Sequence, residues 1–369
     1  PHFNLAFIEE LVGVLRGFED KPTIYLTGAH GTVAPDWVFN KFSVDFVIAG
    51  EPEETIYRIC AGENPKDVEG VIYMSGGRLV RNPPAEPVDL DSLPNPAFHL
   101  LPMDKYYYEI MGDHFTLLEG SRGCPFNCVF CLKKMYSGYR KKSPQKLIEE
   151  IDYVVAKQDV RNIYFIDLEF TVNRQQVECV CRHLIEKKYS LRWCCQTRAD
   201  SLDEELLKLM RDAGCVLIHF GVETGDPDIM RDIGKNITLE DIEEGFRLTH
   251  KMGIDSAGFF MFGFPGETKE NMEKTIDFAK KLNPVYASFH SAAPYPGTRM
   301  NEYYRGRQVF PLCVENEFSL GELRAVVRRA FLSFYLRPGY VISRILRGNP
   351  RSWWQQIKLF TRYITKSKI

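Results

Sequence analysis

The sequence predicts an α/β protein whose centre is a partial parallel barrel of six βα units. An incomplete doubly wound α/β domain precedes this barrel, and a helical C-terminal segment follows it. Three observations lead to this fold class. Six strand-like runs alternate with helical stretches between residues 114 and 290, as in parallel α/β barrels. Apolar strands and helices also alternate between residues 3 and 58, and a basic helical pattern begins after residue 310.

Composition places the chain among globular proteins with a sizeable core. The 369 residues allow two or three domains, and the apolar fraction of 44% is ordinary. A net charge of −2 gives no reason to expect a nucleic-acid partner. We find no run of 18 apolar residues and no signal peptide, so we expect a cytoplasmic protein. Because residues 3–16 already read as a helix just after Pro1, we expect a fragment of a longer chain.

The N-terminal segment carries two strand ends of a doubly wound sheet. The run TIYLTG (23–28) leads into AHGTVAP, which predicts a Gly/Pro loop, and VDFVIAG (44–50) leads into a helix that begins in EPEET. Ligands of such sheets lie outside the carboxyl ends of the strands. The candidate binding residues at these ends are Gly28, His30, Gly50 and Glu51.

Turn signals divide the chain into four parts. Residues 70–82 alternate around Gly76 and Gly77 and predict a β-hairpin. Residues 82–96 hold five prolines and predict a stiff linker. We therefore expect an incomplete α/β domain with a hairpin at 1–81, a linker at 82–110, the partial barrel at 111–310 and a basic helical region at 311–369.

A polar or glycine-containing patch follows each of the six predicted barrel strands. The strands are FTLLEG (115–120), NIYFID (162–167), LRWCCQT (191–197), VLIHFGVE (216–223), SAGFFMFGF (256–264) and YASFHSAA (286–293). The patches are a cysteine loop, Asp167–Glu169, Gln196–Arg198, Glu223, Gly263–Glu267 and Pro294–Thr298. Barrel chemistry takes place at the carboxyl ends of strands, so these patches are the candidate site.

The strongest single signal is GSRGCPFNCVFC (120–131), in which Cys124, Cys128 and Cys131 have C-x3-C-x2-C spacing. A structural zinc site needs four ligands, and a simple ferredoxin cluster needs four thiolates. Three thiolates on a 4Fe–4S cluster leave one iron open to a small molecule. The other cysteines in the barrel strands, Cys194, Cys195 and Cys215 among them, are expected to be core residues in a reducing compartment.

With an aromatic residue, Phe130, before its third cysteine, this motif resembles the signature of the radical S-adenosylmethionine (SAM) superfamily, over residues 111–300. The resemblance implies a 4Fe–4S cluster bound by Cys124, Cys128 and Cys131, whose open iron chelates SAM. One electron then yields methionine and a 5′-deoxyadenosyl radical. An electron donor such as flavodoxin or ferredoxin would supply that electron.

The same resemblance implies roles for the strand-end patches. Asp167 or Glu169 would hold the SAM ammonium group, in a segment that reads Asp-Leu-Glu where many members have Gly-Gly-Glu. Arg198 would lie near the SAM carboxylate and Glu223 near the ribose hydroxyls. Further SAM-binding residues would be Phe130, Gly263 in GFFMFGFPGET and Pro294 in APYPGT.

The N-terminal pattern resembles the second half of the cobalamin-binding domain in the superfamily branch that includes the anaerobic magnesium-protoporphyrin monomethyl ester cyclase and many carbon methylases. That resemblance implies cobalamin in the full-length protein, with Gly28, His30, Gly50 and Glu51 nearest to it, and methylation or ring closure as the reaction. We expect this chain alone to bind cobalamin weakly or not at all. The substrate, a small or lipid-like molecule, cannot be read from the sequence.

Two alternatives remain from the sequence. A methylthiotransferase acting on tRNA or a ribosomal protein resembles the barrel, but it carries more N-terminal cysteines than the one at Cys60. A non-catalytic iron–sulfur or zinc protein would not need the strand-end acids. In addition, residues 321–369 hold eleven basic residues and one acid, with an apolar helix face at Leu323, Val326, Val327, Ala330, Phe331 and Phe334. This face predicts a helix docked on the barrel or a peripheral membrane contact.

Overall fold

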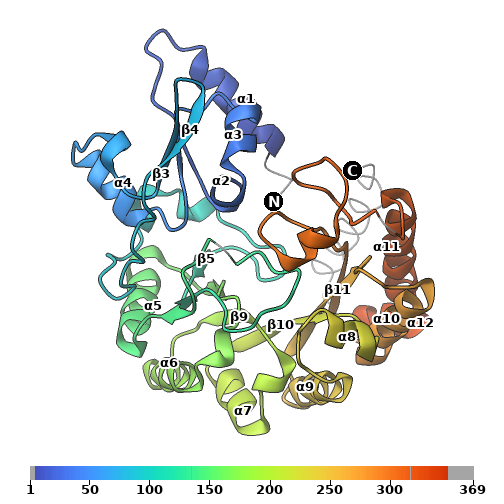
Figure 1. The fold of residues 1–369 in the computed structure, drawn as a ribbon. Helices are drawn as coiled ribbons and strands as arrows, with labels where there is room; N and C mark the ends of the chain where they lie inside the picture. The colour runs from blue at the N-terminus through green and yellow to red at the C-terminus, as the bar shows by residue number, and fades with distance from the viewer. Residues whose placement is uncertain (1–4, 134, 316, 348–369) are drawn as a thin grey trace. The chain divides into compact units, whose positions relative to one another are not determined.

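The computed structural model describes residues 5–133, 135–315 and 317–347. The chain forms two compact units, each assembled from segments that lie far apart in the sequence (Figure 1). Unit 1 consists of residues 1–95, 121–143 and 293–316, and unit 2 consists of residues 96–120, 144–292 and 317–369. The cysteine loop thus groups with the N-terminal sheet. The four-part division expected from the sequence stays a prediction.

Unit 1 is built on a four-stranded sheet with the order β1-β2-β3-β4. Strands β1 and β2 are parallel, as the N-terminal pattern predicts, and β3 and β4 form the predicted antiparallel hairpin. Apolar side chains from α3, β2 and β3 form its core, at Val38, Phe42, Val47 and Ile72. The strands are β1 (Tyr25–Thr27), β2 (Phe46–Ile48), β3 (Val71–Ser75) and β4 (Arg78–Arg81), and the helices are α1 (Leu5–Arg16), α2 (Ala29–Val33), α3 (Pro35–Lys41), α4 (Glu53–Cys60) and the 3₁₀ turn η2 (Pro65–Asp67).

The prediction of a Gly/Pro loop at AHGTVAP is wrong, because these residues form α2 and the start of α3. Gly31 is buried inside α2, where a Cβ atom would lie 2.7 Å from the Val47 side chain. Pro35 occupies the first turn of α3, a position that needs no backbone N–H. Glycine and proline therefore mark close packing and a helix start here.

Two later segments complete unit 1. Residues 121–143 contain the short antiparallel pair β6 (Ser121–Arg122) and β7 (Arg140–Lys141), and the cysteine loop lies between these strands. Residues 293–316 contain the 3₁₀ turn η7 (Arg299–Tyr303). The backbone N–H of Met300 donates to the carbonyl oxygen of Val129 at 2.9 Å, which joins the two segments.

Unit 2 is a partial barrel built on a six-stranded parallel sheet with the order β12-β11-β10-β9-β8-β5. All six strands predicted from the sequence are confirmed. They are β5 (Phe115–Leu118), β8 (Asn162–Phe165), β9 (Arg192–Thr197), β10 (Cys215–Glu223), β11 (Asp255–Phe262) and β12 (Tyr286–Ser291). The predicted core positions Cys194, Cys195 and Cys215 are buried in these strands.

Helices cover the outer face of this sheet (Figure 1). Phe220 of β10 packs on Phe246 of α9 with ring centroids 4.6 Å apart, so its face of the strand is the outer one. Leu217 and His219 alternate with Phe220 and lie on the opposite, inner face. The helices are α5 (Pro144–Gln158), α6 (Arg174–Lys187), α7 (Glu204–Asp212), α8 (Pro227–Asp232), α9 (Leu239–Lys251), α10 (Lys269–Leu282), α11 (Leu320–Tyr335) and α12 (Pro338–Arg347), with 3₁₀ turns η3 (Phe98–Leu100), η4 (Met103–Lys105), η5 (Phe170–Val172) and η6 (Ala199–Ser201).

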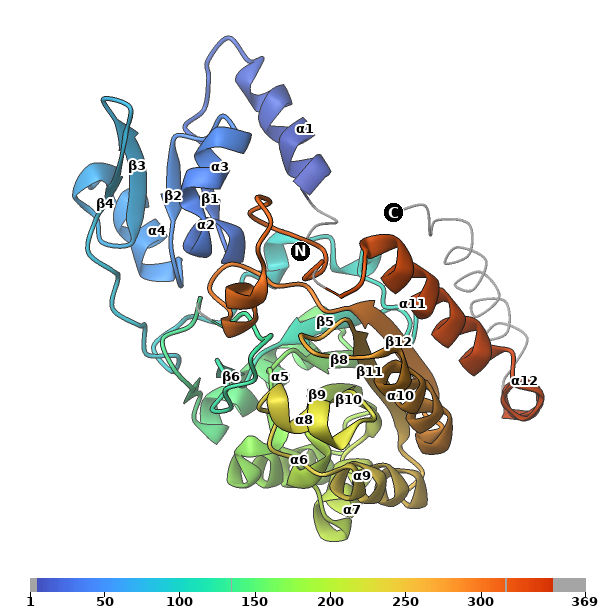
Figure 2. The same cartoon turned by 45° about the vertical axis from the view of Figure 1, so that its right-hand side comes forward.

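The predicted amphipathic tail helix is α11, which packs against α10 and the edge strand β12 (Figure 2). Its side chains Leu323, Ala330 and Phe334 are buried. The Tyr335 hydroxyl donates to the carbonyl of Ala287 and accepts from its N–H, both at 2.9 Å, and so satisfies the free edge of β12. The apolar face of α11 is therefore used inside unit 2. No helix within residues 5–347 is long and apolar enough to cross a membrane.

Candidate functional site

The cysteine loop of unit 1 is closed at its base by a tight backbone contact. Gly123, directly after β6, has a φ of 76°, and any Cβ atom there would collide with the carbonyl oxygen of Gly138. Only glycine fits this position. The β6–β7 pair therefore returns the chain beside its starting point, with Cys124, Cys128 and Cys131 on the loop between the strands.

Lys133 braces the loop from within. Its Nζ donates to the carbonyl oxygen of Cys124 at 3.0 Å and to Oδ1 of Asn127 at 2.9 Å, and it also bonds to the carbonyl oxygen of Phe126. The N–H of Cys131 donates to the carbonyl oxygen of Cys128 at 3.3 Å. These bonds fix the backbone of the loop and the side chain of Asn127.

The three loop cysteines are the candidate ligands of the expected iron–sulfur cluster. Each is free of disulfide bonds and partly exposed. Within the described residues, no three His, Cys, Asp or Glu side chains converge on one point where a metal ion could bind. A cluster has no such requirement, since each thiolate binds a different iron. In contrast, burial raises the pKa of Cys194 and Cys195, which keeps these thiols protonated and unsuited to metal binding.

A buried charge network, which we call the arginine clamp (Glu51, Glu53, Arg122 and Arg140), holds the base of the loop to the N-terminal sheet. Arg122 donates to Glu51 at 2.8 Å and to Glu53 at 2.6 Å, and Arg140 also pairs with Glu51. Burial raises the pKa of Glu51, but the hydrogen bonds from Arg140 and Arg122 outweigh burial and lower it. Glu51, expected at a cobalamin site, thus positions the cysteine loop in this structure.

The other residues expected at the cobalamin site lie at the ends of β1 and β2. The hydroxyl of Thr32 donates to the carbonyl of Gly28 and accepts from the N–H of Gly50, both at 2.9 Å, and so brings the two strand ends together. Gly28 has a φ of 103°, and an added Cβ would meet nothing within 4 Å. The His30 ring packs against Phe310, with centroids 4.4 Å apart. The ends of β1 and β2 therefore meet at two glycines, and there is open space beside Gly28.

In unit 2, the two acids after β8 have different surroundings. Asp167 is 2% exposed, and its Oδ2 accepts the N–H of Gly120 at 2.9 Å, which fixes the residue just before the cysteine loop. Glu169 accepts a long hydrogen bond of 3.5 Å from the hydroxyl of Thr197 and a further one from the backbone of Arg198. Burial raises the pKa of Glu169 to about 7, although Lys235 and Arg198 lower it. A bound cation would therefore stabilise the ionised form of Glu169 more than that of Asp167.

Arg198 and Glu223 are both paired within unit 2. Arg198 bonds to Asp200 at 2.6 Å and to the carbonyl oxygens of Lys235 and Asn236 at 2.5 and 3.0 Å. Glu223 pairs with Lys235 at 3.0 Å, and both side chains are buried. Lys235 is a site residue that the sequence analysis missed, because it lies in a loop with no motif of its own. Its only sequence signal is a lone basic residue in GKNIT, twelve positions after Glu223.

The segment after β11 is organised by a buried carboxylate. Glu267 is 1% exposed, and its Oε2 accepts the N–H groups of Gly263 at 2.5 Å and Phe264 at 3.1 Å. Burial raises the pKa of Glu267 to about 7. Pro294, the other expected adenine-side residue, belongs to unit 1, where its carbonyl accepts from Asn301 at 2.7 Å.

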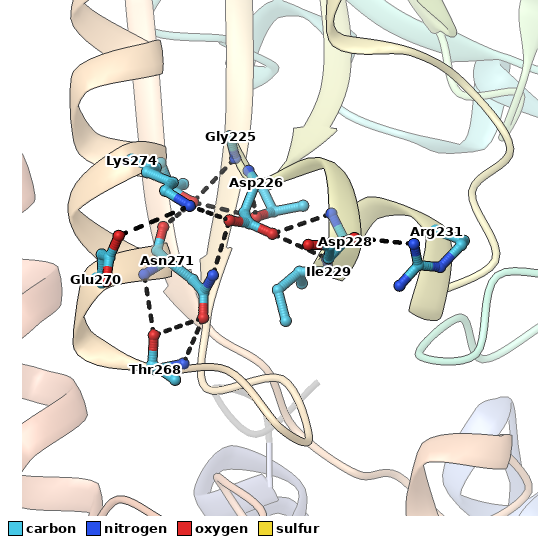
Figure 3. Close-up of polar contacts among 11 residues, drawn as sticks. Gly225, Asp226, Asp228, Ile229, Arg231, Thr268, Glu270, Asn271 and Lys274 are labelled. Carbon is cyan, nitrogen blue, oxygen red and sulfur yellow. Dashed lines mark hydrogen bonds and ion pairs between the residues drawn. The ribbon is translucent and has the colours of Figure 1, made fainter.

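Asp226 anchors the segment that follows Glu223 (Figure 3). It is 1% exposed and caps α8 by accepting the N–H groups of Asp228 at 3.0 Å and Ile229 at 3.1 Å. Its other oxygen accepts from Asn271 at 2.7 Å and from Lys274 at 2.9 Å, both on α10. One carboxylate therefore ties the end of β10 to two helices.

The comparisons with known proteins agree with this arrangement. The family model described as the radical SAM superfamily matches residues 118–279. An uncharacterized methyltransferase of Pyrococcus horikoshii is 32% identical, over 93% of this chain and 81% of its own. The anaerobic magnesium-protoporphyrin IX monomethyl ester cyclase of Rubrivivax gelatinosus is 27% identical, over 86% of this chain and 61% of its own.

Solved structures show the same fold. The cobalamin-dependent SAM radical enzyme OxsB, with aqua-cobalamin and SAM bound, superposes with a TM-score of 0.71 at 17% identity, over 100% of this chain and 61% of that chain. The radical SAM methyltransferase TsrM from Kitasatospora setae, with tryptophan and a SAM analogue bound, gives a TM-score of 0.66 at 20% identity, over 81% of this chain and 61% of that chain. The chain spans about three fifths of these two proteins.

Proposed function

The chain belongs to the radical SAM superfamily, and we propose that Cys124, Cys128 and Cys131 hold the 4Fe–4S cluster with which it cleaves SAM reductively. Family membership implies an enzyme that uses both cofactors. The observation that carries the assignment is the braced loop, which presents three closely spaced, partly exposed cysteines between β6 and β7. When bound, the reduced cluster supplies the electron that breaks a carbon–sulfur bond of SAM.

The residues of this chain would bind and orient SAM. Glu169 would accept the ammonium group, because its carboxylate is half-buried and weakly bonded, whereas Asp167 is committed to Gly120. Lys235 is placed to balance the negative charge of Glu169 and Glu223. The expectation that Arg198 contacts the SAM carboxylate stays a prediction, since Asp200 and two carbonyls occupy its guanidinium here.

Iron counting and EPR spectroscopy of the anaerobically reconstituted protein test the cluster assignment. We expect about four irons per chain and a reduced-cluster signal that changes when SAM is added. Cys128→Ala should abolish that SAM-responsive signal. Cys179→Ala, which removes a half-buried thiol on α6, is the matched control and should leave it unchanged. A complete, SAM-responsive cluster in Cys128→Ala would contradict the assignment.

Iron counting also separates the proposal from its alternatives. A methylthiotransferase with a second cluster would bind about eight irons. A structural iron–sulfur protein would bind about four irons but would show no response to SAM. The partly bonded Glu169 and the buried Glu223–Lys235 pair favour the SAM-binding enzyme, since a structural cluster has no use for them.

We further propose that the full-length protein binds cobalamin and catalyses a methylation or a ring closure. OxsB and TsrM are described with cobalamin bound, and the open space beside Gly28 at the end of β1 supports a ligand at this edge of the sheet. Glu51 is committed to the arginine clamp, so we do not assign it a contact with cobalamin. Ultraviolet–visible titration should show tight binding by the full-length protein and weak or no binding by this chain.

The remaining partners are an electron donor, such as flavodoxin or ferredoxin, and a small-molecule or lipid-like substrate. A peripheral membrane contact would involve α12 rather than α11, because α12 exposes Val341, Ile342, Ile345 and Leu346 on one side. Exposed aliphatic side chains on a basic helix favour anionic interfaces. Ile342→Glu should then reduce co-sedimentation with anionic vesicles at low salt. Equal sedimentation of variant and wild type would exclude this contact.

A further inference from the structure

His219 lies on the inner face of the unit 2 sheet, outside the residues assigned to SAM. Its side chain is 4% exposed, and neither ring nitrogen has a hydrogen-bond partner in the described part of the chain. Proteins rarely leave a buried polar group in this state without a functional reason. A polar group on a bound ligand would give one of these nitrogens a partner.

Two neighbouring rings hold the imidazole in place. Tyr164 and Phe259 stack on it with centroid separations of 5.2 and 5.7 Å, each tilted by 18°. The stacking fixes the ring plane, so the positions of both nitrogens are set before any ligand arrives. Burial lowers the pKa of His219 to about 4, which leaves the ring neutral near pH 7 with one donor and one acceptor.

The ring neighbours Tyr164 and Phe259 and the strand partner Gln196 of His219 are uncharged. Gln196 is its register partner on β9 and accepts from the Tyr164 hydroxyl at 3.3 Å. On β12, Ser288 and His290 bond to each other at 2.6 Å. An ionic group on a ligand would meet no countercharge among these side chains.

Part of this inner face is open rather than packed. Leu117, the register partner of Tyr164, is 46% exposed, and Ile166, two residues after Tyr164, is 43% exposed. Large aliphatic side chains lose contact with water when an apolar molecule covers them. The face therefore combines exposed apolar surface with fixed, neutral hydrogen-bonding groups.

We infer that this inner face is a substrate subsite for an uncharged, largely apolar molecule that presents one hydroxyl, carbonyl or ring N–H group to His219. The inference rests on the proposed function, because it names the class of substrate on which a SAM-cleaving enzyme would act. His219 would contact and orient that substrate. Leu117 and Ile166 would cover its apolar part.

Small aromatic probes test the inference with the reconstituted protein. Phenol carries a neutral hydroxyl, toluene lacks it, and benzoate and benzylamine carry opposite charges. Ligand-observed NMR gives the affinity of each probe for the wild type, for His219→Phe and for the control His183→Phe. The control replaces a histidine on α6 that bonds to Asp152 on α5. We expect phenol to bind best and His219→Phe to weaken phenol binding about three- to tenfold, the value of one hydrogen bond. His183→Phe should have no effect.

A second measurement does not depend on a variant. Phenol should shift the ring carbon resonance of His219 in the histidine-labelled wild-type protein. No shift, or equal phenol binding by His219→Phe, would overturn the inference and would mean that water alone satisfies the ring. Benzoate or benzylamine binding as tightly as phenol would overturn the assignment to uncharged ligands. SAM cleavage in the same samples reports on the proposed function separately.

Discussion

At the scale of single residues, the protonation state of Glu169 is expected to control SAM binding. Its pKa is raised to about 7 by burial, against the lowering effects of Lys235 and Arg198. Below that pH the side chain is protonated and cannot pair with an ammonium group. We therefore expect the dissociation constant for SAM to rise as the pH falls from about 8 to about 6.

The variant Glu169→Gln should bind SAM about tenfold or more weakly at pH 8, because it loses a charge-assisted hydrogen bond. It should also lose the pH dependence. Equilibrium dialysis with SAM measures both effects, and Glu205→Gln, whose side chain is 86% exposed on α7, is the control. A pH dependence that persists in Glu169→Gln would assign the titration to another group.

Asp226 makes a corresponding prediction for stability (Figure 3). Burial raises its pKa, but the bonds from Lys274, Ile229 and Asn271 outweigh burial and lower it. A carboxyl group whose pKa is lowered on folding stabilises the protein above its unfolded pKa of about 3.9, and this contribution disappears as the pH falls through the folded value. Asp226→Ala should lower the free energy of unfolding by about 2 kcal/mol at pH 7.

Urea denaturation measures this difference. The difference in the free energy of unfolding between wild type and Asp226→Ala should be constant from neutral pH down to about pH 4 and should decrease only below that pH. Asp228→Ala removes an exposed pair with Arg231, in which both side chains are more than two thirds exposed, and should change little. An effect of Asp228→Ala as large as that of Asp226→Ala would show that capping and burial are not the cause.

At the scale of elements, the arginine clamp sets the position of the cysteine loop. Glu51, whose side chain is 8% exposed, is the carboxylate that Arg122 and Arg140 share, so replacing it removes the central negative charge of the clamp, at a cost of about 3 kcal/mol. Glu51→Gln should therefore release iron to a chelator up to about a hundredfold faster than wild type. Asp36→Asn, which breaks an exposed pair with Arg81, is the control. Equal release rates would show that the clamp does not hold the loop.

The elements were largely predictable from the sequence, and their contacts were not. Apolar runs with helical stretches between them identify all six barrel strands, because burial on both faces leaves a clear pattern. The clamp joins Arg122 to Glu51 across 71 positions, and no local pattern encodes such a pairing. Helix α2 was missed because Gly31 reads as a turn until its packing against Val47 is known.

The site residues also divide into those that the sequence predicts and those that only the structure shows. The cysteine spacing predicts the cluster ligands that we propose, since all three cysteines lie within eight residues of one another. Lys235 was missed because its partner Glu223 lies on a different element, and His219 reads as an ordinary strand residue. The two acids after β8 could not be separated until the Gly120–Asp167 bond was seen. Burial and hydrogen bonding, rather than residue type, distinguish these side chains.

On the scale of the whole molecule, the cysteine loop belongs to unit 1 and the acidic strand ends belong to unit 2. The proposed cluster ligands and the proposed SAM-binding acids thus belong to different units. The chain also spans only 61% of the Rubrivivax cyclase that it resembles. For this reason the full-length protein is the fair sample for any assay of activity, with this chain measured beside it.

Formation of 5′-deoxyadenosine from SAM tests most directly whether the three loop cysteines carry a working cluster. The reconstituted full-length protein is reduced with dithionite, incubated with SAM under anaerobic conditions and analysed by chromatography. We predict 5′-deoxyadenosine and methionine from the wild type and from Cys179→Ala, and only the level of the unreduced control from Cys128→Ala. Absence of 5′-deoxyadenosine from a wild-type sample with a complete cluster, or its undiminished formation by Cys128→Ala, would contradict the account.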